Sequence, residues 1–148
     1  MDVDVTAREI VDGNRYLTLA TADAAGRPRA SPVWYAHDQY RAFLWVSRPD
    51  ARHSANIGER PEVGIVIFDS TVPVGSAAAL YADAVAEEVG AAEREAAVAI
   101  FSARSVAAGL RGWDAGDVSG EAAHRLYRAT ASGLYLLDAG DRRMPITP

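Results

Sequence analysis

Four side chains suited to binding an anion lie close together near the middle of the chain: Ser47, Arg52, His53 and Ser54. Pro49 and Asp50 end the apolar run before them, and Asp50 is a suitable N-cap for a helix running to about residue 60. Arg52 and His53 then fall in the first helical turn. Unpaired N–H groups and the helix dipole favour an anion there, and a guanidinium adds bidentate hydrogen bonds. The pattern predicts a phosphate site; the alternative is a surface turn with a solvated Arg.

The flanking segments show the alternation and turn residues of β-strands. We expect strands at 16–21, 29–35, 43–46, 62–69, 80–89, 124–130 and 133–138, with turns at 25–28 and 37–39 and helices at 50–60 and 90–101. The helix at 90–101 carries Ala92, Ala96, Ala99 and Ile100 on one stripe, which predicts a buried scaffold face. The chain is therefore expected to be mainly β, with a few helices.

The order strand, turn, strand, turn, strand, helix, strand over 16–69 resembles the pyridoxamine 5'-phosphate oxidase-like family of flavin-binding split β-barrels. The matching residues are 16–35, Ser47, the pair Arg52-His53, and 60–68. The resemblance continues through 68–75 and 80–89, and more weakly through 126–130. It implies a single FMN-binding domain over 1–148, with its core at 14–138, built as a split barrel of about six antiparallel strands.

The second expected strand carries the cofactor-ring segment of the resemblance. Pro32 lacks a ladder donor and is confined to edges or bulges, where backbone is free to meet a ligand. Family members place the edge of the flavin ring against this segment, and Arg29 beside it is a candidate cation for the reduced ring. The cofactor-binding residues that we expect are Arg29, Ala30, Ser31, Pro32, Val33, Trp34, Val46, Ser47, Arg52, His53, Ser54 and Trp113.

The chain departs from the family pattern at two places. His53 stands where members usually have Lys or Arg, so the charge at the phosphate depends on the surroundings of this imidazole. Many members also place a polar side chain near the start of the next strand, where this chain has 77–79 as three alanines. We expect that contact either to be missing or to be supplied by Ser76 or a backbone group.

The resemblance implies a flavin-dependent oxidoreductase that transfers electrons or a hydride to or from a small molecule. FMN is the favoured cofactor, and an 8-hydroxy-5-deazaflavin is the alternative. FMN is favoured because proteins that bind the deazaflavin usually have Lys or Arg at the second basic position, where this chain has His53. A flavin-binding sensor or carrier without turnover stays open. We expect no catalytic triad, since the flavin carries the electron chemistry. The family also implies a homodimer, with which the small residues Ala82, Ala84 and Ala86 on one strand are compatible.

Composition excludes several other classes. The chain has 148 residues, a formal charge of −5 and a pI near 5.1, which argue against a nucleic-acid partner. It has no cysteine and only three histidines, so no metal site is expected. The N-terminus is acidic, and no run approaches the ~18 apolar residues of a membrane span. We therefore expect a cytoplasmic protein without a membrane partner.

Two further segments carry expectations. Residues 102–120 combine four glycines with charged residues and Trp113, and a loop of this length is often functional. Trp113 is expected to lie over the flavin ring or close a substrate mouth, or else to plug the barrel end. Trp34 and Tyr35 point to opposite faces of their strand, so at most one faces the barrel interior. The tail 142–148 is expected at the surface.

Overall fold

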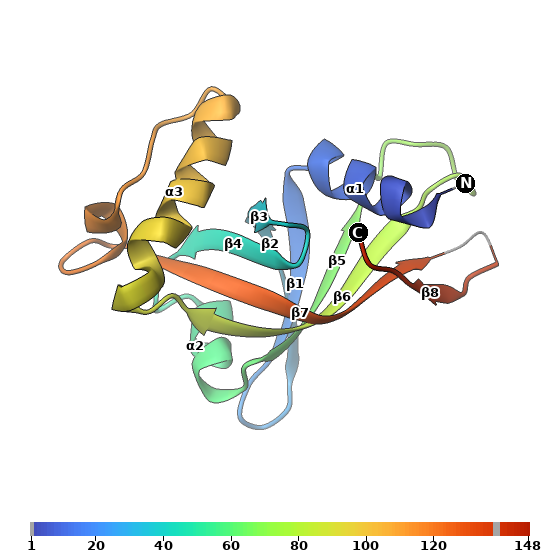
Figure 1. Cartoon of the computed structure of the whole chain (residues 1–148). Helices are drawn as coiled ribbons and strands as arrows, with labels where there is room; N and C mark the ends of the chain where they lie inside the picture. The colour runs from blue at the N-terminus through green and yellow to red at the C-terminus, as the bar shows by residue number, and fades with distance from the viewer. Residues whose placement is uncertain (1, 138–139) are drawn as a thin grey trace.

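The computed structural model describes residues 2–137 and 140–148, and these form three α-helices, one 3₁₀ turn and eight strands (Figure 1). In chain order the elements are α1 (Val3–Gly13), β1 (Tyr16–Ala22), β2 (Pro28–Trp34), β3 (Ala36–Asp38), β4 (Ala42–Ser47), α2 (Arg52–Glu59), β5 (Glu62–Phe68), β6 (Ala79–Glu88), α3 (Ala91–Ala107), η1 (Ala115–Val118), β7 (Arg125–Leu137) and β8 (Arg143–Pro145).

The strands form one antiparallel sheet in the order β2-β1-β5-β6-β7-β4-β3, with β8 paired to β7. The sheet curls into a split barrel that leaves β2 at one end of the strand order and β3 at the other (Figure 1). The mainly-β split barrel is thus confirmed. The expected number of about six strands was too low, because β3 and β8 have only three residues each.

The two strands expected at 124–130 and 133–138 are one continuous strand, β7. An irregularity in its pairing with β6 between Asp83 and Ala84 accommodates the residues that looked like a break. Asp138 lies outside the described residues. The turn expected at 37–39 is also displaced, since β3 extends to Asp38 and the chain reverses at Gln39 and Tyr40, both with positive φ.

Helix α1 covers the interior of the barrel and was not expected. Asp2 caps it by accepting hydrogen bonds from the N–H groups of Asp4 and Val5. Ala7 and Val11 are fully buried in the same cluster as the inward side chains of β6. The buried Tyr35 hydroxyl donates to the Val11 carbonyl oxygen at 2.6 Å, which fixes the helix to the end of β2.

The small residues of β6 have a packing role inside this chain. Ala82, Ala84 and Ala86 are at most 4% exposed and point into the barrel, where α1 packs on the strand. The interpretation of this small face as a surface for a partner chain was therefore wrong. The outward side chains of β6 include Tyr81, Asp83 and Val85, whose alternation with the alanines follows the period of two expected in a strand.

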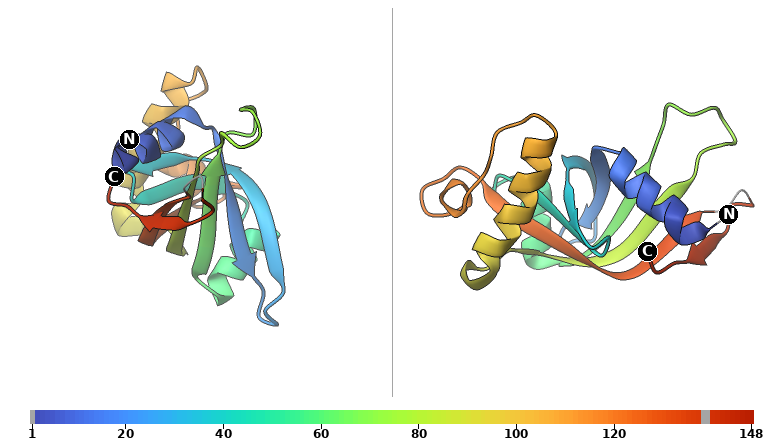
Figure 2. Two further views of the ribbon diagram at one scale, coloured as in Figure 1. Left: turned by 90° about the vertical axis from the view of Figure 1, so that its right-hand side faces the viewer. Right: turned by 45° about the horizontal axis from the view of Figure 1, so that its top comes forward.

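Helix α3 and the segment 108–124, together called the wing, stand beside one end of the sheet (Figure 2). The wing packs through a second hydrophobic cluster, separate from the barrel core: Ala36, Leu44, Val89, Ala97, Val98, Phe101, Val118 and Leu126. The buried stripe predicted for this helix was wrong: its alanines at 92, 96 and 99 are exposed, and Ala97, Val98, Phe101 and Ser105 are buried instead.

The helix also runs six residues further than expected, so the irregular segment begins at 108 rather than 102. The expectation that residues 142–148 lie at the surface was only partly correct, because Ile146 packs into the barrel core. Among the described residues, no helix is long and apolar enough to cross a membrane.

Candidate functional site

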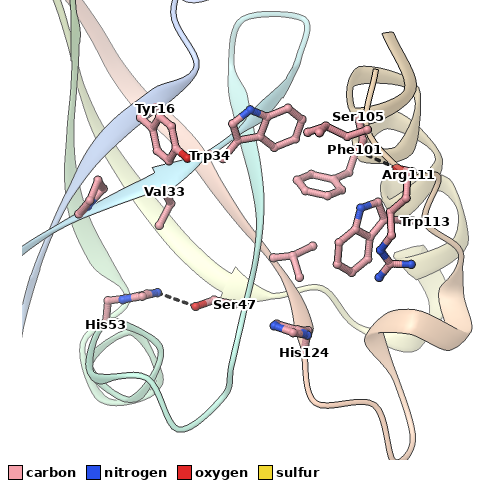
Figure 3. A pocket seen from close by; sticks show the side chains of 13 residues that line it. Tyr16, Val33, Trp34, Ser47, His53, Phe101, Ser105, Arg111, Trp113 and His124 are labelled. Atoms are coloured by element: carbon pink, nitrogen blue, oxygen red, sulfur yellow. Dashed lines mark hydrogen bonds between the residues drawn. The ribbon is translucent and has the colours of Figure 1, made fainter. Parts of the chain in front are cut away.

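A cleft of about 600 Å³ separates the barrel from the wing (Figure 3). Its barrel wall consists of Tyr16, Pro32, Val33, Trp34, Val46, Ser47 and His53. Its wing wall consists of Phe101, Ser105, Leu110, Arg111, Trp113 and His124. The cleft therefore brings together the ends of β2 and β4, the start of α2, and a segment some 60 residues further along the chain.

Helix α2 begins at the cleft without a side-chain cap. Its N-cap is Ala51, with extended backbone angles, and no side chain bonds the first-turn N–H groups. The prediction of Asp50 as the N-cap was wrong: the helix starts one residue later, and the Asp50 carboxylate pairs with Arg48 at 3.1 Å. Because no side chain satisfies them, the first N–H groups of α2 remain available to an external anion.

Ser47 and His53 meet at this end of the cleft. The Ser47 Oγ and His53 Nε2 atoms are 2.7 Å apart, and the bond joins the end of β4 to the first turn of α2 (Figure 3). Burial lowers the pKa of His53 below its ordinary value, and the positive charge of Arg29 lowers it further. The imidazole is therefore predominantly neutral near pH 7, and the positive charge of Arg29 acts on it.

Strand β2 presents free backbone to the cleft. The Tyr35 N–H donates to the Arg15 carbonyl, and this bond determines which residues of β2 form hydrogen-bonded pairs with β1 in the antiparallel ladder. By the alternation of such ladders, the backbone groups of Ala30, Pro32 and Trp34 point away from β1 toward the open edge. Pro32 occupies a position where no ladder donor is needed, so the edge position inferred from this proline is confirmed.

The wing wall is an aromatic cluster. The Phe101 ring meets Trp34 edge to face at 5.3 Å between centroids and Trp113 at 5.7 Å. Trp113 in turn meets His124 at 6.3 Å, and the Arg111 guanidinium lies 3.6 Å from the centroid of the Trp113 ring. One face of Trp113 is thus covered by a cation. The ring packs in the wing cluster, so it does not plug the barrel end.

Side chain to backbone hydrogen bonds hold the irregular part of the wing in place. Ser102 Oγ accepts from the Trp113 N–H at 2.9 Å, and the Ser105 hydroxyl donates to the Arg111 carbonyl at 2.7 Å. A capping box between Asp114 and Asp117 starts η1. The Arg125 guanidinium binds three backbone carbonyls just before β7, those of Gly120, Ala122 and His124. The segment is therefore an ordered wall rather than a loose loop.

Seven of the twelve residues expected to bind a cofactor line the cleft: Pro32, Val33, Trp34, Val46, Ser47, His53 and Trp113. The other five do not line it: Arg29, Ala30, Ser31, Arg52 and Ser54. Arg52 is exposed at the first position of α2, next to His53. The expectation that Ser54 offers a hydroxyl to the phosphate does not fit, because its Oγ is buried.

Sequence reasoning missed most of the wing wall. Phe101 belongs to a helix interpreted as scaffold. Ser105, Leu110 and Arg111 lie in the segment 102–120, in which only Trp113 was assigned a role, and His124 was placed at the start of a strand. The only signal in that region was the concentration of glycines around Trp113. In the part of the chain that the structure describes, no group of three or more His, Cys, Asp or Glu side chains is placed to hold a metal ion.

The sequence matches the pyridoxamine 5'-phosphate oxidase family over residues 4–136, so the chain belongs to that family. The match covers α1 through nearly all of β7, and with them every residue of the cleft. No curated protein is similar enough in sequence to match the chain.

Several solved structures share the fold. A heme-binding protein from Mycobacterium smegmatis superposes with a TM-score of 0.75 at 22% identity over 95% of this chain, which spans 56% of that protein. HutZ, the heme storage protein from Vibrio cholerae, gives 0.70 at 24% identity over 91% of this chain and 94% of its own. An F420 reductase gives 0.62 at 15% identity, covering 86% and 94%. At these identities the likeness establishes the fold alone.

Proposed function

We propose that the protein is an FMN-binding oxidoreductase of the cytoplasm that exchanges electrons or a hydride with a small molecule. The observation that carries the proposal is the construction of the cleft. One end has an uncapped helix N-terminus with a histidine and a hydroxyl, one wall is a free strand edge, and the opposite wall is aromatic. A ligand with a phosphate group and a planar ring fits such a cleft, because the helix N-terminus can bind the phosphate and the strand edge and aromatic wall can contact the ring.

The residues at the α2 end fit a phosphate. The N–H groups of the first turn, the Ser47 hydroxyl and the His53 imidazole offer donors, and Arg29 and Arg52 supply permanent positive charge nearby. In the middle of the cleft, the free N–H of Trp34 on the β2 edge is a donor for a heteroatom of the ring. Val33 and Val46 provide the apolar surface between these two places.

A flavin would supply the redox chemistry itself. The chain's own residues would position the ring against β2, bind its phosphate, and limit access of water from the wing side. The cleft contains no nucleophile paired with a base beyond the Ser47–His53 contact, and that contact belongs to the anion end. The wing wall, with Arg111 and His124, faces the space left for a second substrate.

Two other ligands remain candidates. A deazaflavin would use the same ring position, but the exposed Arg52 and the neutral His53 offer little for its acidic tail. Haem is a candidate because His124 lines the cleft beside Trp113, and its imidazole would bind the iron. The visible absorption spectrum of the purified protein separates the three ligands. A Soret band without a flavin spectrum would reject the proposal.

We further propose a homodimer in which a second copy closes the cleft. Tyr16 lines the cleft and is 58% exposed, and it lies on the outward face of β1. Phe68 and Val85, on the outward faces of β5 and β6, are 46% and 49% exposed. This partly apolar sheet face, which reaches the cleft at Tyr16, supports an isologous contact.

The phosphate end can be tested with one substitution and two ligands. Arg52→Ala should weaken FMN binding by about 1.5 kcal/mol, or roughly tenfold, the lower end for a charge-assisted hydrogen bond because Arg52 is exposed. Riboflavin, which lacks the phosphate, should bind wild type and variant equally well. Arg94→Ala, which makes the same charge change on α3, is the control. Unchanged FMN affinity in the Arg52 variant would remove this residue from the site.

A further inference from the structure

A second cavity, of about 440 Å³, adjoins the cleft. It is lined by Arg15, Tyr16, Trp34, Arg104, Ala107, Ala108 and Leu110. Tyr16, Trp34 and Leu110 also line the cleft, so these three side chains form a wall common to both cavities. We propose that this cavity, called the Arg15–Arg104 pocket, binds the anionic group of a carboxylate-bearing aromatic substrate.

The first support is the charge of the pocket. Its only ionisable side chains besides the Tyr16 phenol are two guanidinium groups. Among the described residues, no carboxylate forms an ion pair with either of them, whereas five other arginines are paired in this way. The two guanidinium groups therefore give this cavity a local positive charge on a chain whose net charge is −5.

The second support is the way in which Arg104 is held. Its Nη2 atom lies 3.5 Å from the Asp12 carbonyl oxygen and 3.4 Å from the Asn14 carbonyl oxygen, at the junction of α1 and β1. These contacts orient the guanidinium while using one of its nitrogens, and leave the other donors for a ligand. The Asp12 carboxylate is hydrogen-bonded to His37 and to the Tyr40 hydroxyl, and it forms no ion pair with Arg104.

The third support comes from the end of α3, which closes the pocket. A helix C-terminus normally repels anions through its unpaired carbonyls. Here the Ala108, Gly109 and Leu110 N–H groups bond the carbonyls of the last helical turn, those of Arg104, Ser105 and Val106. These carbonyls of α3 are therefore bonded within the chain, and Arg104 in the last turn adds a positive charge at this end of the helix.

The composition of the common wall indicates the body of the ligand. Tyr16 and Trp34 present aromatic surface between the two cavities, and an aromatic ring packs well against such surface. A carboxylate accepts bidentate hydrogen bonds from a guanidinium. The pocket thus fits an aromatic carboxylate whose acid group is held by the arginines and whose ring extends toward the cleft. Its role as a substrate subsite rests on the proposed function.

The test uses benzoate and benzamide, which share a ring and differ in charge. In calorimetric titrations of the full chain, benzoate should bind more tightly than benzamide, and added salt should weaken only the benzoate complex. Arg15→Gln should weaken benzoate roughly five- to tenfold, the scale of one partly screened charge-assisted hydrogen bond, and leave benzamide unchanged. The Arg15 side chain makes no hydrogen bond within the described residues, so this variant should fold normally.

Two further variants complete the design. Arg104→Lys keeps the charge but loses the planar fork, so it should also weaken benzoate. Arg94→Gln makes the same charge change as Arg15→Gln on a surface outside the pocket, and should match wild type. Equal affinity for benzoate and benzamide, or equal losses in the Arg15 and Arg94 variants, would overturn the proposal. FMN titrations of the same variants report the proposed function separately, because FMN binding should be the same in all of them.

Discussion

Truncation of Phe101 tests whether the wing is held to the barrel as the structure indicates. The ring is 4% exposed and makes edge-to-face contacts with Trp34 and Trp113. Replacing a buried Phe by Ala costs about 3–5 kcal/mol. The ring also borders the cleft, so water can fill part of the space that it leaves. We therefore expect Phe101→Ala to lower the free energy of unfolding by about 3 kcal/mol, the lower end of that range.

Urea denaturation followed by circular dichroism and by tryptophan fluorescence measures this loss. The control is Val106→Ala on the same helix, where a side chain 58% exposed should change stability by about 0.5 kcal/mol or less. Trp34 and Trp113 report on the wing, whereas Trp45, fully buried and stacked on Tyr127, reports on the barrel. A loss below about 1 kcal/mol for Phe101→Ala would refute the view that this ring fixes the wing.

Three other results are expected. The pKa of His53 is lowered in the free protein, and a phosphate dianion should raise it in the complex, so the affinity for FMN should fall as pH rises between these two pKa values. The control is His53→Lys, measured over the same pH range. A wild-type profile no steeper than that of this variant would leave the imidazole outside the phosphate site. Sedimentation should give a dimer at micromolar concentration, and Phe68→Arg should shift it toward monomer; a monomer with full FMN affinity would show that one chain completes the site. Tyr35→Phe should cost about 1–2 kcal/mol in urea denaturation, because the buried Val11 carbonyl loses its donor, and a change within about 0.3 kcal/mol would mean that α1 is held by other contacts.

The positions of most barrel strands along the chain were predictable because alternation and turn residues are local signals. The edge position of β2 followed from Pro32 alone, since a proline inside a sheet removes a ladder bond. Helix α1 was missed although its signal was present. Asp2 is a good N-cap, and Ala7 and Val11 recur at helical spacing. Only the acidic charge of this N-terminal segment was considered, and the helical spacing of its apolar residues was overlooked.

The candidate site was predictable only on its barrel side. Ser47 and His53 are six residues apart, so their meeting at the start of α2 follows from local structure. Phe101 and His124 reach the same cleft from the far half of the chain, and only the packing of the second cluster determines that placement. The cap of α2 failed for a local reason: Arg48 competes for the Asp50 carboxylate, and a propensity for the N-cap position does not include such a competitor.

The separation of the two hydrophobic clusters has a consequence for how this protein can diversify. The barrel core and the wing cluster share no buried residue, and both reach the cleft, the first through Val33 and the second through Phe101. Substitutions within α3 and 108–124 can therefore reshape the ligand-facing wall while the barrel core keeps its packing. An evolving or engineered lineage can exchange specificity on one side of the cleft and retain the anion end at α2 on the other, so stability and ligand choice can be selected largely independently.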